Sequence, residues 1–298
     1  MRSDRHCPPR LINFPRDDRD LLSLDGTLEP HAPMILPWVI DPVLIGTLLT
    51  LGVAYGLLAG PLRSRLEGSV PATRMQITLF TSGLLVAFLT EASPLHELSE
   101  RYLFSAHMVQ HLLLSYVVAP LLIAGTPGWM VRPLAKNRIV GPVFLALTRP
   151  LIAFIVFSLA FTLWHLPMVY EAALISPFVH HLQHVIFLAL AVLIWWPVMS
   201  PLPEIPRSGY GVQVFYLAAL PLGQFFVAAI LTFAPESFYP TYQAASRILP
   251  MSAAADQQLG GVIMKIASFI AFGIPLVVAF LRWFGGDRSS PATRPSAH

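Results

Sequence analysis

The pattern His-x-x-Gln-His occurs twice in this sequence, in a context that suggests metal chemistry. The two copies are HMVQH at 107–111 and HHLQH at 180–184, and each stands at the start of a long apolar stretch. Residues four apart lie on one face of a helix, so each copy offers two imidazoles to one neighbouring group. Ionisable side chains are costly inside an apolar span and by default indicate function there. The repeated pattern therefore predicts a metal or haem site between two membrane helices.

The composition indicates a polytopic membrane protein and not a soluble one. The chain has 298 residues, of which 55% are hydrophobic and only 12% are charged. Stretches of about 20 apolar residues recur, and this length crosses the roughly 30 Å of hydrocarbon in a bilayer. The pI of 9.2 does not indicate nucleic-acid binding, because the basic residues fall in short loops, where they set membrane topology.

These stretches predict an all-α bundle of seven transmembrane helices between two polar tails. The expected spans are 36–59, 74–92, 102–124, 148–166, 178–199, 210–233 and 257–283. Residues 1–35 are expected to be a disordered polar tail, 36–284 the transmembrane domain, and 285–298 a polar cytoplasmic tail. The single cysteine, Cys7, lies in the N-terminal tail and excludes an intrachain disulfide.

Lysine and arginine are distributed unevenly between the two sets of loops. One set is basic, and it contains Arg63, Arg65, Arg132, Lys136, Arg138 and Arg207. The opposite loops are mainly acidic. The positive-inside rule therefore predicts an outside N-terminus and a cytoplasmic C-terminus. In this orientation all the histidines that are candidate metal ligands lie in the outer half of the membrane. They are His107, His111, His165, His180 and His184.

Other polar residues near the outer end are candidates for supporting roles. Gln110 and Gln183 are placed to fix the orientation of a neighbouring imidazole by hydrogen bonding. The last span opens with a polar mouth that includes Asp256 and Gln258, and Asp256 is also a candidate for the N-cap of that helix.

Two residues further along the last span raise separate expectations. Lys265 lies about 12 Å inside the span by helical rise. A buried ammonium needs a partner or must reach the interface, and Glu91 is the natural carboxylate for it. Met264 precedes it, and thioether together with imidazole favours Cu(I), although methionine is also a common filler of apolar cores.

The sequence resembles a known family along most of its membrane region. LTEASPLHELSERYLFSAHMVQHLLLSYVVAPLLIAGTP at 89–127 is similar to the signature of the CtaG-type cytochrome c oxidase assembly proteins. The family's later motifs are matched, in the same order, by WHLPMVYEAAL at 164–174, HHLQH with WWPV within 180–198, and DQQLGGVIM at 256–264. The resemblance covers roughly residues 75–284.

This resemblance implies a seven-helix bacterial inner-membrane protein that is needed to form active oxidase of the caa type. It also links the chain to copper supply for the oxidase. By resemblance, functional importance carries over to His107, His111, His165, His180, His184 and Asp256. Lys265 departs from the family's pattern, in which an aromatic residue is more usual.

We therefore expect an assembly factor that is not an enzyme. It would bind copper from the periplasmic side through the histidines and pass it on by ligand exchange. The expected partners are cytochrome c oxidase subunits and the lipid bilayer, with a periplasmic copper carrier as a further candidate and no nucleic acid.

Two alternative functions are consistent with the same residues. An intramembrane zinc hydrolase would use three histidines and Asp256 around a zinc-bound water. A b-type cytochrome would use histidine pairs as haem ligands, but two stacked haems need ligands in both leaflets, and these histidines fall at one depth.

Overall fold

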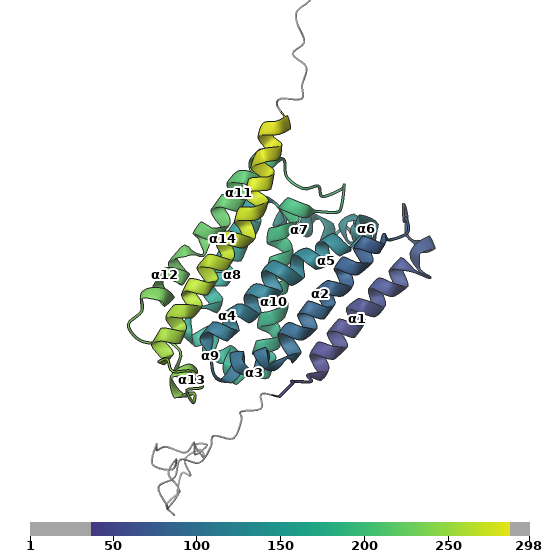
Figure 1. The fold of residues 1–298 in the computed structure, drawn as a ribbon. Coiled ribbons are helices and arrows are strands. Elements are labelled where there is room, and N and C mark those ends of the chain that lie inside the picture. The colour runs from purple at the N-terminus through teal and green to yellow at the C-terminus, as the bar shows by residue number, and fades with distance from the viewer. Residues whose placement is uncertain (1–36, 287–298) are drawn as a thin grey trace, which may run out of the picture. The chain divides into compact units, whose positions relative to one another are not determined.

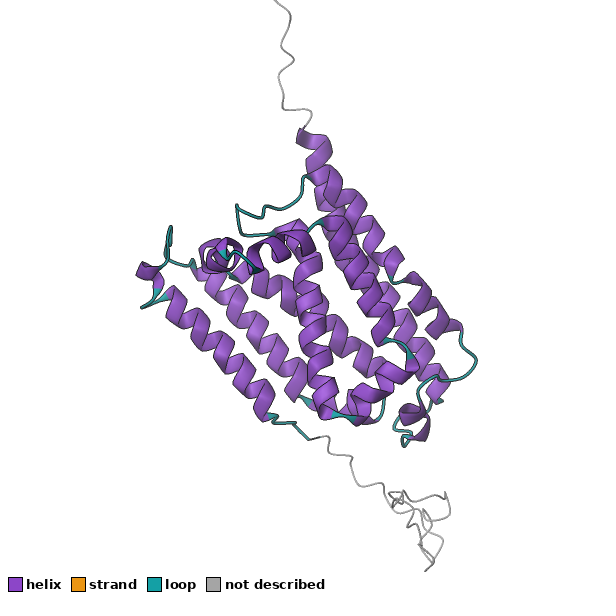
Figure 2. Cartoon of the chain, turned by 180° about the vertical axis from the view of Figure 1, so that it is seen from behind, coloured by secondary structure: helices purple, strands orange, loops and turns teal. Residues whose placement is uncertain are grey.

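The structure is a computed structural model that describes residues 37–286. Every regular element in that range is a helix, and Figure 2 shows these helices packed into one bundle. Six helices are long and apolar enough to span a membrane, and a bent pair adds a seventh if it counts as one span. The predicted all-α membrane bundle is therefore confirmed. Cys7 and both predicted tails, apart from residues 285 and 286, lie outside the described residues.

The long apolar helices coincide with predicted spans. The uninterrupted ones are α1 (Pro42–Ala59), α2 (Arg74–Ala92), α10 (Pro177–Met199) and α14 (Ala253–Gly286). Two other spans are interrupted. The third runs from α4 (Phe104–Leu113) through the π-helical turn η3 (Leu114–Val118) into α5 (Ala119–Gly125), and the sixth is divided into α11 (Tyr210–Gly223) and α12 (Phe225–Phe233).

The fourth predicted span is shorter than expected and is preceded by a sharp bend. It consists of α8 (Pro150–Trp164), which meets α7 (Val140–Leu147) at 82°. Arg149 between them is extended, with ψ of 133°. The ring of Pro150 disfavours helical geometry at the preceding residue, so the chain changes direction there.

Short helices occupy several of the connections between the predicted spans. They are η2 (Arg63–Arg65), α3 (Pro94–Arg101), α6 (Gly128–Lys136), α9 (Pro167–Ile175) and α13 (Pro240–Ala244). The start of α3 follows from local chemistry, because the Ser93 hydroxyl accepts a hydrogen bond from Leu95 N and Pro94 occupies the first turn. Serine as N-cap followed by proline is a common helix start.

The order of the helices in the bundle determines which polar groups meet. Figure 1 shows α1 at one edge beside α2, and α14 packed along α11 and α12. The third span contacts both α2 and α10, while α4 also packs against α14. As a result the last turn of α2 and the first turns of α4 and α10 lie close together at one end of the bundle, with α3 beside them.

The π-helical turn η3 directly follows the first His-x-x-Gln-His motif. A π turn holds one residue more than an α turn and occurs frequently at functional sites. Across this turn Ala119 N donates to the Leu114 carbonyl, and Pro120 has no N–H to donate to the Ser115 carbonyl. Trp195 Nε1 on α10 donates to the Ser115 carbonyl at 2.9 Å. Both residues are buried. This bond ties the middle of the third span to α10.

Replacing Trp195 by phenylalanine is expected to destabilise the protein by about 2 kcal/mol, because the buried Ser115 carbonyl loses its donor. Thermal unfolding of the purified protein in detergent measures the effect. Trp129→Phe is the matched control, since Trp129 is equally buried but its Nε1 has no hydrogen-bond partner. Equal losses in the two variants would contradict a role for the Trp195 bond.

Candidate metal centre

Four imidazoles from α4 and α10 form one cluster, which we call the histidine cluster: His107, His111, His180 and His184. Ring centroids lie 4.4 Å apart within the α4 pair and 4.1 Å apart within the α10 pair. The rings of His111 and His184 join the pairs at 5.0 Å. His107, His111 and His180 are buried and His184 is nearly so. Both pairs therefore face a common interior, as their spacing predicts.

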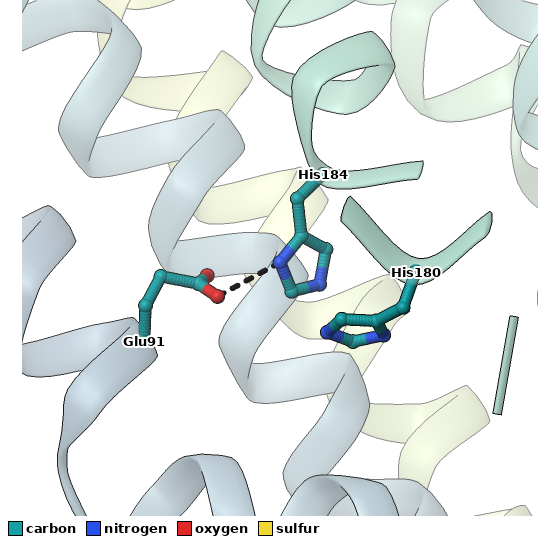
Figure 3. A group of neighbouring side chains, drawn as sticks. All are labelled: Glu91, His180 and His184. Atoms are coloured by element: carbon teal, nitrogen blue, oxygen red, sulfur yellow. Dashed lines mark ion pairs between the residues drawn. The ribbon is translucent and has the colours of Figure 1, made fainter. Parts of the chain in front are cut away.

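A carboxylate from α2 fixes the ring of His184. Glu91 Oε2 lies 2.8 Å from His184 Nδ1, and Figure 3 shows this ion pair with the ring of His180 beside it. A neutral imidazole that donates through Nδ1 keeps a lone pair on Nε2. Such a carboxylate contact is the usual device that sets the tautomer of a metal-binding histidine and raises its basicity.

A second carboxylate, Glu100 on α3, lies between the two histidine pairs. Its Oε2 is 3.1 Å from His180 Nδ1 and its Oε1 is 3.3 Å from His107 Nδ1. No role for Glu100 is predicted from the sequence, because residues 93–101 form a connection between two predicted spans. The detectable signal was the four-residue spacing of His96 and Glu100 after Ser93-Pro94, which places both on one face of a helix.

The free ring nitrogens make this cluster suitable for a metal ion. His184 Nε2 and His180 Nε2 are buried without a hydrogen-bond partner, while His180 Nδ1 lies 3.1 Å from Glu100 Oε2. Buried polar atoms are rarely left unsatisfied, because their desolvation is costly. One atom from each of Glu91, His180 and His184 lies within 4.8 Å of the others. This triad can hold a metal ion, and imidazole with carboxylate is compatible with several transition metals.

His96 on α3 is held next to the cluster by Gln110. Gln110 Nε2 donates to His96 Nδ1 at 2.9 Å, and its Oε1 accepts from the Ser99 hydroxyl at 2.5 Å. Burial lowers the pKa of His96, although the carboxylates of Glu100 and Glu91 act in the opposite direction. Gln110 therefore does orient an imidazole, but it is that of His96 and not one of the cluster.

Two of the predicted supporting residues, Gln183 and Gln258, are not seen to orient an imidazole of the cluster. Gln183 is buried, yet its Oε1 has no partner, so the expected hydrogen bond to an imidazole is not formed through that atom. Gln258 Nε2 donates to the Ala234 carbonyl at 2.8 Å, which fixes the loop before α13 and does not reach the cluster.

The predicted pair between Lys265 and Glu91 is wrong. Lys265 Nζ donates to the Pro221 carbonyl at 2.6 Å and lies over the rings of Phe225 and Phe269, at 5.1 and 4.5 Å from their centroids. A carbonyl and aromatic faces stabilise the ammonium. Glu91 is instead engaged by His184.

Asp256 supports the start of α4 and does not cap its own helix. Its Oδ2 accepts from Phe104 N at 2.7 Å, and its Oδ1 accepts from Ser105 N at 3.2 Å and from the Ser105 hydroxyl. A carboxylate at a helix N-terminus satisfies free N–H groups and the helix dipole. The predicted N-cap role is wrong, because α14 already begins at Ala253. Asp256 thus fixes the turn that presents His107.

His165 follows α8 as its C-cap residue and is not one of the four rings of the histidine cluster. It is buried, and its Nδ1 contacts the Phe161 carbonyl at 2.6 Å. Its Nε2 has no hydrogen-bond partner. Met264 lies nearby, because both residues line one small cavity together with His111.

Comparison with known proteins places the fold and these motifs in context. A family model described as cytochrome c oxidase caa3 assembly factor (Caa3_CtaG) matches residues 53–285. The chain is 24% identical over 267 residues to an uncharacterized protein of Mycobacterium leprae. The aligned region covers 84% of this chain and 40% of that protein. For an uncharacterized protein of Mycobacterium tuberculosis the identity is 24% over 285 residues, covering 90% of this chain and 42% of that protein. The chain thus spans about two fifths of the length of these curated relatives. No solved structure matches the chain.

Proposed function

Because the chain belongs to the family of cytochrome c oxidase caa3 assembly factors, we propose that it binds copper at the histidine cluster and transfers it to an oxidase subunit. The observation that carries this proposal is the triad of Glu91, His180 and His184, with its buried and unpartnered ring nitrogens. The carboxylate orients an imidazole, and that imidazole offers a lone pair to copper as the cargo.

Transfer by ligand exchange fits the donors of this site. Imidazole is a ligand of intermediate softness that suits copper. Glu91 keeps the proton of His184 on Nδ1, so release of the metal needs no proton transfer at that ring. Donors from a docked subunit then replace the imidazoles one after another. No covalent bond of a substrate is broken in this scheme, so the protein acts as a carrier and not as an enzyme.

The hydrolase alternative receives less support from the polar contacts. It needs Asp256 as a zinc ligand. Both carboxylate oxygens of Asp256 are engaged at the start of α4 by Phe104 and Ser105. The haem alternative needs a slot for a macrocycle, whereas cavities lined by these histidines measure about 120, 170 and 20 Å³. Ligand sites commonly measure about 300–1,000 Å³.

We place the site on the periplasmic side of the bacterial inner membrane, because basic loops favour the cytoplasmic face. The test is cysteine labelling from outside the cell in a Cys7→Ser background. A cysteine at Arg101, which is exposed on α3, is expected to be labelled, and one at Asn137 is not. Labelling of the Asn137 position alone would reverse the orientation and remove the argument for periplasmic loading.

The function itself is tested in cells that depend on the oxidase. With His184→Ala we expect oxidase polypeptides that are made and inserted but depleted in copper, and added copper should partly restore activity. His181→Ala is the matched control, since His181 is on the same helix but contacts Asp41 at 3.0 Å and lies outside the cluster. Normal oxidase copper with stably expressed His184→Ala would refute the proposal.

A further inference from the structure

A small cavity lies beside the histidine cluster, between α4, α8, α10 and α14. Its volume is about 20 Å³, and four potential metal donors line it: Met108, His111, His165 and Met264. A cavity needs about 10–15 Å³ to hold one water, so this one has room for a single ion. The exposed fractions of the four residues are 2%, 6%, 9% and 3%.

The two histidines that line this cavity each have an unpartnered nitrogen. His165 Nδ1 is engaged by the Phe161 carbonyl, which requires its proton to be there and leaves the lone pair on Nε2. That Nε2 is buried and has no hydrogen-bond partner. A fixed tautomer with a free inward nitrogen is the state in which a histidine binds metal.

A similar argument applies to His111. Its Nε2 lies 2.6 Å from His107 Nε2, so one of the two nitrogens carries the proton. His107 Nδ1 makes no hydrogen bond, but the negative charge of Glu100, 3.3 Å away, favours a proton on it, and His107 Nε2 is then the acceptor. His111 then donates through Nε2, and its Nδ1, which is also without a partner, carries the lone pair.

The close approach of α14 brings the second thioether to this cavity. Gly260 faces α4, and a Cβ at that position would lie 2.5 Å from Phe104 Cδ1 and 3.3 Å from Met108 Cγ. The absence of a side chain lets the helices meet there. Met264 follows one turn later on the same face and lines the cavity with Met108.

The donor types select the charge and softness of the ion. Within the described residues 37–286, no carboxylate lines this cavity. A bound ion would therefore have no acidic side chain to neutralise its charge. Desolvation penalises a divalent ion far more than a monovalent one. Thioether and neutral imidazole are soft or intermediate ligands that favour Cu(I).

We propose that this cavity is a second metal site, which holds Cu(I) through His111, His165, Met108 and Met264. The proposal rests on the proposed function in that copper is taken as the cargo. This second site, which we call the inner site, lies next to the triad, because the ring of His111 that lines the cavity is 5.0 Å from the ring of His184. Copper would therefore pass between two neighbouring sites.

X-ray absorption at the copper edge tests the inner site directly. The purified full-length protein, loaded with Cu(I) under anaerobic reducing conditions, is expected to show sulfur together with nitrogen around copper. A Met108→Leu/Met264→Leu variant keeps the core volume, and it should lose the sulfur signal and bind one equivalent of Cu(I) fewer. Met130→Leu/Met199→Leu is the matched control, because these methionines lie on α6 and at the end of α10, and it should behave as wild type.

The outcomes separate the two proposals. A wild-type spectrum with nitrogen and oxygen only would refute the inner site, and this measurement does not depend on the folding of any variant. His180→Ala/His184→Ala is expected to lose Zn(II), used as a divalent probe of the triad, while it keeps sulfur-coordinated Cu(I). If the sulfur site is found but oxidase copper is normal in cells with His184→Ala, the inner site stands and the transfer function fails.

Discussion

Replacing His180 and His184 together by alanine is expected to weaken divalent metal binding at the triad by at least about a hundredfold, since even the loss of one supporting contact costs about 10- to 100-fold. Only Glu91 of the three candidate ligands would remain. Titration of the purified protein with Zn(II) or Cu(II) against a competing chelator measures the change. Unchanged affinity in the double variant would show that metal binds elsewhere in the chain.

The role of Glu91 can be separated from that of the histidines. Glu91→Gln preserves the size of the side chain but removes the charge that faces His184. We therefore expect the affinity for metal to fall by about 10- to 100-fold, which is less than in the double histidine variant. Glu97→Gln is the matched control, because Glu97 lies on α3 and pairs with Arg101 at 3.1 Å. Equal affinities for these two variants would contradict any role of Glu91 at the metal.

Asp256→Ala is expected to be the most destabilising of these substitutions, at about 3–9 kcal/mol, because each buried group left unsatisfied costs about 1–3 kcal/mol. The affected groups are the N–H of Phe104, the N–H of Ser105 and the Ser105 hydroxyl. Metal affinity should fall as well, since the first turn of α4 positions His107. Thermal unfolding in detergent and metal titration provide the two measurements.

Asp41→Ala provides the comparison for Asp256→Ala. Asp41 also accepts backbone N–H bonds at a helix start, from Val43 and Leu44, but it is partly exposed. Loss of an exposed N-cap costs about 1 kcal/mol, because water then solvates the freed groups. If the two variants lost the same stability, burial of the Asp256 contacts would not be the cause.

The sequence predicts those features of the site that are determined within a single helix. His107 with His111, and His180 with His184, share a face because the spacing of four residues is a property of the helix itself. Equal depth follows from counting residues along each apolar stretch. For this reason the convergence of the two pairs could be expected before any packing was known.

The contacts between helices could not be predicted in the same way. Depth alone made Glu91 a reasonable partner for Lys265, but depth does not state which helices are neighbours. Glu91 lies on α2, close to α10, whereas Lys265 on α14 faces α11 and α12. The assignment failed because the angular position of each helix in the bundle is set by packing, which one sequence does not reveal.

Roles that depend on irregular segments were also missed. Glu100 belongs to a region that apolar periodicity describes only as a connection between spans. Its helix α3 is short and polar, so it gives no membrane signal, and only the Ser93-Pro94 start indicates it. The span limits and residue roles assigned from family resemblance remain predictions, as does the orientation in the membrane.

The π-helical turn after His111 changes the directions in which the two halves of the third span face. One residue corresponds to about 100° of rotation around a helix. The extra residue in η3 therefore offsets the face that carries the two histidines from the face with which α5 packs against α2 and α10. Without this offset, a straight helix could direct only one of these faces correctly. The single additional residue allows one span to serve two neighbours at two different angles.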